Sequence, residues 1–465
     1  MVEAVEAAPI APGAGASSRN SGPLAQFSWA LFDGCRSPYN VLVNIFVFSA
    51  YFTGVVIPDS VHGQVVWSYV TSSAAFLVAL GAPILGAIAD AGGKRKPWLA
   101  ATVLLGVPCM AAIWFAVPNM HAGLGWVMLA LIGASISFEY SAIFCNAMLP
   151  NIAQPRRISF LSGLGLSLGN AMGILLFLFF LLAWSWNPHP LFGLRNELHE
   201  PERAVGMLAA FWFAVFSIPL FLFTPDSPAT LRKPGEAIVH GLRQLAGTIT
   251  KVGRYRNLVT FLIARMSFNE GFLGLMLFTG VFAKGILQWT PTMLVAEGLI
   301  NSVVAAIAGL FAGWLDRSLG SKPATMIFVA GGMIATVVIV SVTPQHVFFF
   351  LPVAPAAAGS HSLFPTLSDQ VFLVAQCSAA FFVTGGLVTA RAMMARLSPR
   401  EMLNEFFGLF ALSGTATAFI GPLAVGIVTQ IYNNQRAGVL VGAIFMLVGL
   451  LLMILVKEEP VAADS

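Results

Sequence analysis

Six ionisable side chains lie inside long apolar stretches of this chain, where a charge is costly. They are Asp33, Arg36, Glu139, Arg265, Glu270 and Glu297. A charged side chain at the centre of a membrane-spanning helix costs about 2.5–3.5 kcal/mol on insertion scales, so six unpaired charges would cost roughly 15–20 kcal/mol. We therefore expect these side chains to face one another or a water-filled cavity. In such a cavity carboxylates can carry protons and guanidinium groups can attract anionic solutes.

Helical spacing groups these residues with one another and with polar neighbours. Asp33 and Arg36 are three residues apart, so they share a helix face and are expected to neutralise each other. An asparagine shares a face with each of three others: Asn146 with Glu139, Asn269 with Arg265, and Asn301 with Glu297. Arg265 and Glu270 lie about 140° apart around a helix, so they need not be partners. Four carboxylates and two guanidinium groups predict that at least one carboxylate is protonated in some state.

These patterns lead to the hypothesis of a path for a solute and a proton. Glu139 or Glu270 would carry the coupling proton, and Arg265 would attract a carboxylate of the solute. The other residues assigned to the path are Asp33, Arg36, Asn44, Asn146, Asn269 and Glu297. The alternative is an ion pair that only fixes helix packing, and Asp33 with Arg36 is its clearest case.

The elements that must hold these residues are membrane-spanning helices. The chain has 465 residues, of which 57% are hydrophobic and 9% charged, whereas soluble domains are about 25% charged. This composition excludes soluble enzymes, secreted disulfide-linked domains and nucleic-acid-binding proteins. A bilayer core about 30 Å thick needs about 20 apolar residues per helix. Twelve stretches qualify, at about 28–57, 65–89, 97–117, 122–149, 159–183, 203–224, 257–283, 291–315, 323–343, 370–396, 405–430 and 436–456.

The distribution of Lys and Arg predicts the orientation of these spans. Most of the 24 Lys and Arg fall on the side that holds both termini. The exceptions are Arg195, Arg203, Lys284 and Arg436 on the other side, and Arg36 and Arg265 inside spans. The positive-inside rule therefore places both termini in the cytoplasm. The start of the chain lacks a signal-peptide pattern, and we expect an integral protein of a bacterial inner (plasma) membrane.

A long polar stretch at residues 225–256 divides the spans six and six. Its apolar residues recur at helical spacing among basic ones, which predicts a cytoplasmic linker with an amphipathic helix on the inner leaflet. The predicted units are a flexible cytoplasmic tail at 1–27, a six-helix bundle at 28–224, the linker, a second six-helix bundle at 257–456, and a cytoplasmic tail at 457–465. Two such repeats with a site between them are typical of secondary transporters.

Short cytoplasmic loops repeat between the two halves. They contain Asp90, Lys94, Arg95 and Lys96 after the second span, Asp316 and Arg317 after the eighth, and Arg400 before the eleventh. We predict that these loops are gate latches. Their aspartate contacts would form when the outer side is open and break when the inner side opens. Pro422 predicts a bend in the eleventh span.

Several motifs resemble those of a known family. They occupy residues 28–33 (SWALFD), 83–90 (PILGAIAD), 95–99 (RKPWL), 394–397 (MARL), 405–414 (EFFGLFALSG) and 435–438 (QRAG). Together they look like the vacuole-effluxer-like branch, the autophagy-related amino-acid effluxers, of the major facilitator superfamily. The resemblance implies an all-α integral membrane fold, with twelve transmembrane helices in two pseudo-symmetric six-helix bundles. It also implies amino acids or similar zwitterions as solutes.

The predicted function is secondary active transport of a small solute by alternating access, coupled to protons. Two alternatives are a lipid or lysolipid translocator on the same fold and a membrane receptor that does not transport. No nucleotide-binding loop, nucleophile triad or metal-ligand spacing occurs in the sequence, so we expect neither an enzyme nor a cofactor or metal. The expected partners are the solute, protons and the lipid bilayer, with no nucleic acid, and the chain is expected to be a monomer.

Overall fold

A computed structural model describes residues 21–92, 94–153, 155–187, 189–226, 255–356, 362–398 and 403–457. These residues contain twelve helices that are long and apolar enough to cross a membrane, which confirms the predicted number of spans. The predicted linker helix lies outside the described residues except at its ends, and Arg400 lies outside them too.

The N-terminal bundle contains the first six spans. Its main helices are α1 (Pro23–Cys35), α3 (Ser60–Gly92), α4 (Lys96–Ala112), α5 (Leu124–Ile152), α6 (Pro155–Phe179) and α7 (Glu200–Phe223). The first span continues beyond α1 as the π-helical η1 (Tyr39–Phe46), the short α2 (Phe48–Tyr51) and the π-helical η2 (Phe52–Val56). Shorter helical segments are η3 (Ile113–Phe115), η4 (Phe180–Ser185), η5 (Leu191–Gly193) and η6 (Asn196–Leu198).

The first helix begins at Pro23, inside the segment that the sequence analysis assigns to a tail. Proline is favoured at the first position of a helix, where its missing N–H costs no hydrogen bond. The early turns also pack against the bundle, because Gln26 is buried and its amide donates to the carbonyl of Ile152, 3.2 Å away. These contacts, which are remote in sequence, extend the span beyond its apolar stretch.

The C-terminal bundle contains the other six spans. Its helices are α9 (Arg256–Leu287), α10 (Pro291–Leu319), α11 (Ser321–Ser341), α12 (Leu367–Leu397), α13 (Leu403–Ala416), α14 (Ile420–Tyr432) and α15 (Gln435–Leu455). Strands β1 (His346–Val347) and β2 (Leu351–Pro352) form an antiparallel pair between α11 and α12. The eleventh span consists of α13 and α14 and is interrupted at residues 417–419, shortly before Pro422.

The ends of several helices follow from local sequence. Proline stands in the first turn of α1, α4, α7 and α10, where it fits helical geometry. Thr366 and Asp369 form a reciprocal capping box at the start of α12. Asn433 ends α14 with φ +47°, the left-handed conformation that commonly ends helices.

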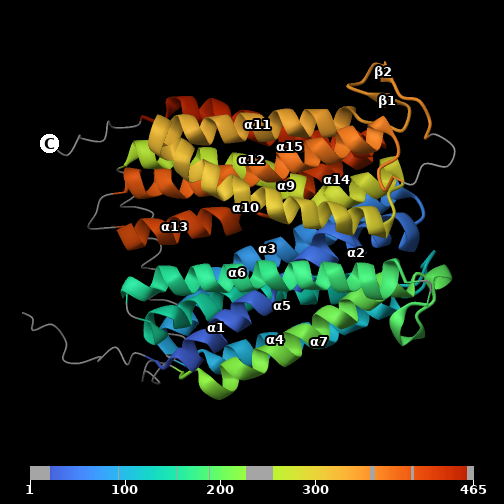
Figure 1. Cartoon of the computed structure of the whole chain (residues 1–465). Coiled ribbons are helices and arrows are strands. Elements are labelled where there is room, and N and C mark those ends of the chain that lie inside the picture. Colours follow the sequence, from blue (N-terminus) through green and yellow to red (C-terminus); the bar gives the residue numbers. More distant parts are fainter. Residues whose placement is uncertain are drawn as a thin grey trace, which may run out of the picture.

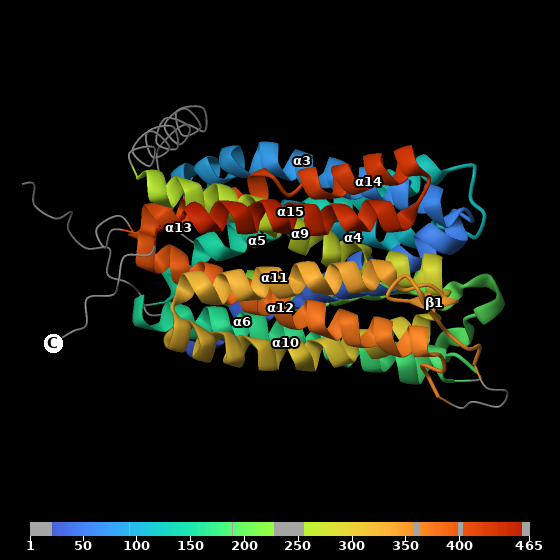
Figure 2. The same ribbon diagram turned by 90° about the horizontal axis from the view of Figure 1, so that it is seen from above.

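The two bundles lie side by side, with α1–α7 in blue to green and α9–α15 in yellow to red (Figures 1 and 2). The start of α1 and the end of α15 lie at the same end of the helices, on the left in Figure 1. We call this the terminal end. The opposite end, which carries β1 and β2, is called the distal end.

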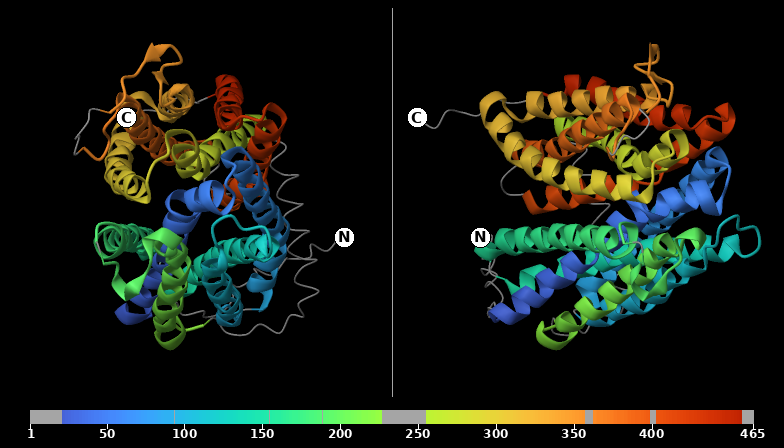
Figure 3. Two further views of the ribbon diagram at one scale, coloured as in Figure 1. Left: turned by 90° about the vertical axis from the view of Figure 1, so that its right-hand side faces the viewer. Right: turned by 45° about the vertical axis from the view of Figure 1, so that its right-hand side comes forward.

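Hydrogen bonds between described residues join the two bundles at one end. They lie in the distal half, where α3 bonds to Phe419, to α14 and to α15. The ribbons of the two bundles meet there in Figure 3. Gln64 donates to Thr429 over 2.8 Å and the Tyr69 hydroxyl donates to Gln430 over 2.6 Å. A contact between Ser185 and Thr292 also joins the bundles there. The structure is therefore closed at the distal end.

Candidate transport path

Asp33 and Arg36 form the predicted ion pair, with 2.8 Å between Oδ1 and Nη2. Their side chains are 19% and 13% exposed, respectively. A second bond runs from Arg36 Nη1 to the carbonyl of Phe138 on α5, 3.1 Å away, and the guanidinium carbon lies 5.0 Å from the centre of the Phe138 ring. The pair therefore stands where α1 ends and fixes the first span against α5.

Glu139 is exposed although it lies within a membrane-spanning helix. It is one turn after Ser135, which contacts the Tyr39 hydroxyl over 3.0 Å. Because residues four apart share a helix face, Glu139 lies on the side of α5 that faces the first span. Arg36 also acts electrostatically on its carboxylate. Asn146 is exposed on the same stripe, so this part of α5 presents polar groups to open space beside the first span.

Asn44, the remaining predicted residue of this bundle, lies in η1 and is half-buried. Its amide nitrogen is 3.5 Å from the side-chain oxygen of Asn40, one turn earlier. The wider spacing of a π-helix changes which side chains share a face relative to an α-helix. No pattern in the sequence predicts this π-helical segment.

Arg265 on α9 is only 8% exposed. Its Nη1 donates to the carbonyl of Phe410 over 2.7 Å and to the hydroxyl of Ser413 over 2.6 Å. The guanidinium carbon also lies 3.6 Å from the centre of the Phe410 ring. Among the described residues no carboxylate pairs with Arg265, and the charged group that acts on it is another guanidinium, that of Arg391. Asn269, one turn later, is half-buried.

Glu270 lies at the interruption of the eleventh span. Its side chain is 2% exposed, and Oε2 accepts a hydrogen bond from the backbone N–H of Gly421 over 2.8 Å. Thr417 also interacts with the carboxylate. Arg265 and Glu270 therefore bind opposite sides of the break, with the cation near the end of α13 and the anion at the start of α14. Both positions match the partial charges of helix ends.

Glu297 is fully buried on α10. Its Oε1 accepts from the Asn301 amide over 3.2 Å, as their spacing predicts, and its Oε2 has no hydrogen-bond partner. The expectation that every ionisable residue would face another charge or water is thus wrong for Glu270 and Glu297. For Glu270 the backbone N–H of Gly421 takes the place of a cation, through a contact between helices that no single-helix pattern displays. For Glu297 the amide of Asn301 on the same helix does so.

The predicted latch residues form contacts within each bundle. Asp316 accepts from Arg396 over 2.8 Å, and both belong to the C-terminal bundle. This contact is present although the distal end is closed. The contact joins α10 to α12 within one bundle, and its predicted dependence on the opening of either side stays a prediction.

The matching loop of the N-terminal bundle is held in a similar way. The backbone N–H of Arg95 donates to Asp226 over 2.8 Å, and Lys96 Nζ donates to the carbonyl of Phe221 over 2.8 Å. Lys94 and Arg317 are exposed. Asp90 lies in the last turns of α3, with its side chain outside the described part of the structure.

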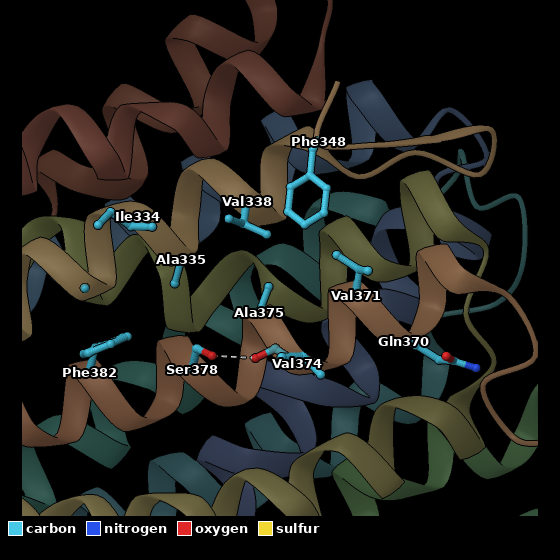
Figure 4. Close-up of a pocket in the computed structure, with 11 residues that line it drawn as sticks. Ile334, Ala335, Val338, Phe348, Gln370, Val371, Val374, Ala375, Ser378 and Phe382 are labelled. Carbon is cyan, nitrogen blue, oxygen red and sulfur yellow. Dashed lines mark hydrogen bonds between the residues drawn. The ribbon is translucent and has the colours of Figure 1, made fainter. Parts of the chain in front are cut away.

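A groove of about 440 Å³ lies elsewhere, between α11 and α12 (Figure 4). Its walls include Ile334, Val338, Val374 and Phe382, with Phe348 near the distal end. Ile334 is 59% exposed and Val374 is 65% exposed. Because both helices belong to one bundle and their exposed side chains are apolar, the groove lies on the surface that faces lipid and not between the bundles.

Comparisons with known proteins agree with this architecture. The family model described as "Vacuole effluxer Atg22 like" matches residues 53–464. An uncharacterised MFS-type transporter of Bacillus subtilis (strain 168), YxiO, is 23% identical over 441 residues, which cover 93% of this chain and 94% of that protein.

A second relative is autophagy-related protein 22 of the fungus Cryptococcus neoformans (var. neoformans serotype D, strain JEC21). It is 25% identical over 265 residues, which cover 54% of this chain and 43% of that protein. This chain thus matches less than half the length of the fungal protein. Among solved structures, a D-xylose–proton symporter superposes with a TM-score of 0.65 at 12% identity, covering 94% of this chain and 98% of the symporter.

The matched family, the twelve spans and the fold are those of secondary transporters in membranes. The resemblance carried by the motifs is therefore confirmed. This chain is an integral membrane protein that belongs to the vacuole effluxer Atg22-like family of the major facilitator superfamily.

Proposed function

We propose that the protein moves a small solute that bears a carboxylate across a bacterial plasma membrane by alternating access, coupled to protons. The observation that carries this proposal is Arg265. It is a guanidinium within a membrane-spanning helix that no described carboxylate neutralises. Such a charge is retained in a membrane where it binds a ligand or serves transport. Its Nη1 is held by α13, so the group is fixed in place before a solute arrives.

The path runs between the bundles from the terminal end, which faces the cytoplasm. The Lys and Arg distribution supports that orientation, and the bacterial relative supports the plasma membrane. Glu139 and Asn146 line the path from the N-terminal bundle, and Arg265 and Asn269 line it from the C-terminal bundle. The resemblance carried by the sequence motifs implies amino acids as the solutes. The lateral groove gives no support to lipid passage, because it lies within one bundle.

Flux measurements on purified protein in proteoliposomes test this proposal. A panel of amino acids and uncharged analogues is offered with and without an imposed pH gradient. We expect accumulation of at least one carboxylate-bearing solute, driven by the gradient. Arg265→Gln should lose at least about tenfold in transport, and Arg265→Lys should keep part of it.

The matched control is Arg256→Gln, which removes an exposed arginine from the same helix, α9. It should transport at the wild-type rate. Transport that is unaffected by Arg265→Gln, or accumulation of only uncharged analogues, would contradict the role of this guanidinium.

A further inference from the structure

We propose that the coupling proton binds Glu270, and that its binding releases α14 from α3 and so opens the distal end. This inference rests on the proposed proton coupling. It assigns the proton to Glu270 rather than to Glu139, and it states that proton binding opens the distal end. Three features of the described structure carry it: the surroundings of the carboxylate, the helix end it binds, and the position of that helix.

The surroundings of Glu270 suit a group that gains and loses a proton. The carboxylate is almost fully buried, and its Oε1 has no hydrogen-bond partner. No described charged side chain acts on it electrostatically, and its neighbours across the interruption are the Thr417 hydroxyl and the Gly421 N–H. On its own helix the nearest ionisable group is Arg265, which is bonded to α13.

The other elements packed around this site add no charge. Next to Glu270, Gly271 meets the Gly442 carbonyl and Met446 of α15. On α3 the described side chains that reach the interruption are the Ser72 hydroxyl and the Phe76 ring, and neither is charged. Glu139, the other candidate, differs from Glu270 in lying near a cation, Arg36, which favours its ionised form.

The helix end that Glu270 binds depends on its charge. The first N–H groups of a helix have no acceptor within the helix, and together they carry a partial positive charge. Ionised Glu270 supplies both an acceptor and a negative charge to the start of α14. Protonation removes that charge and leaves a weaker acceptor. The start of α14 is therefore held more weakly when Glu270 is protonated.

Helix α14, whose start binds Glu270, is also the helix that contacts α3 and closes the distal end. The carbonyl of Phe419, which accepts the backbone N–H of Leu423 in the first turn of α14, also accepts from the Ser72 hydroxyl of α3 over 2.7 Å. The ring of Phe419 also packs against Phe76, with centroids 5.2 Å apart. Further along α14, Thr429 and Gln430 accept hydrogen bonds from α3. Residues 417–421 thus contact both the proton-binding carboxylate and the other bundle.

The experiment measures opening of the distal end directly. Ser68 is fully buried and packs against Gly426 of α14, so Ser68→Cys reports separation of the two helices. The reporter is placed in a background in which the four native cysteines are replaced. Its labelling rate by a water-soluble maleimide is measured across pH in lipid nanodiscs. The rate is corrected for the pH dependence of thiol reactivity by labelling the variant His62→Cys, because His62 is exposed.

We expect the corrected labelling rate to rise as the pH falls. Glu270→Gln, which resembles the protonated form, should label about tenfold faster than wild type at neutral pH, with no further pH response. Glu270→Asp, which keeps an ionisable group, should keep the pH response. Asp369→Asn is the matched control, because it neutralises another buried carboxylate of the same bundle, on α12 and away from α14; it should behave as wild type.

Wild-type labelling and wild-type pH response in folded Glu270→Gln would overturn the inference. The flux assay separates this outcome from failure of the proposed function. Proton-driven transport that persists in Glu270→Gln places the proton elsewhere and overturns the inference alone. Wild-type transport that does not depend on the pH gradient overturns the proton coupling itself, and the inference with it.

Discussion

Replacing Gly280 by valine is expected to prevent closure of the distal end and to abolish transport. Gly280 lies on α9 where it meets the first span of the other bundle. A Cβ there would collide with the carbonyl oxygen of Ile45 and would lie 3.2 Å from that of Phe46. Both are backbone atoms, so neither can rotate away. Overpacking of this kind shifts an equilibrium by about tenfold to a hundredfold.

The measurement is the labelling rate of the Ser68→Cys reporter together with solute flux. Gly280→Val should label rapidly at every pH and show little transport. Gly274→Val is the matched control, because it lies on the same helix and a Cβ at that position meets nothing within 4 Å. Wild-type flux in Gly280→Val would show that this close approach of the bundles is not needed for the transport cycle.

Replacing Asp33 by alanine is expected to lower the free energy of unfolding by about 3 kcal/mol. The substitution leaves the Arg36 guanidinium without its carboxylate in a site where the side chain is 13% exposed. Arg36 Nε is already buried without a partner, so the remaining bond to Phe138 cannot compensate. Denaturation of the purified variants in detergent measures the loss.

A double-mutant cycle separates this pairing from simple packing. Asp33→Ala with Arg36→Met removes both charges and keeps most of the apolar volume, so it should be more stable than Asp33→Ala alone. If the double variant is less stable than the single one by the full cost of Arg36→Met, the two side chains do not interact energetically. The ion pair would then not be what fixes the first span to α5.

The features that can be predicted from the sequence depend on the length of one helix and on the spacing of residues along it. Twelve apolar stretches of sufficient length become twelve spans because a bilayer requires that length. Asp33 with Arg36 and Glu297 with Asn301 meet as expected, since residues three or four apart share a helix face. Pro422 indicates an irregular eleventh span, and the interruption lies just before it.

The features that the sequence does not predict depend on contacts between helices. Glu270 binds Gly421, 151 residues away, and no spacing rule connects them. Arg265 donates to Phe410 and Ser413 of α13, which are 145 and 148 residues away. The hydrogen bonds of Gln64, Tyr69 and Ser72 to the other bundle come from uncharged polar groups within an apolar stretch. Nothing in that stretch indicates their partners. Their partners are fixed only when the two bundles pack together.

Distances measured across both ends of the molecule test alternating access most directly. Spin labels at His62 and Asn433 report the distal end, and labels at Arg157 and Ser318 report the terminal end; all four residues are exposed. Double electron–electron resonance in nanodiscs at high and low pH would give both distances. We predict that the distal distance increases at low pH while the terminal distance decreases. Two distances that change in the same direction, or that do not respond to pH, would contradict the account. Neither result fits a proton-driven alternation between a state open only at the terminal end and a state open only at the distal end.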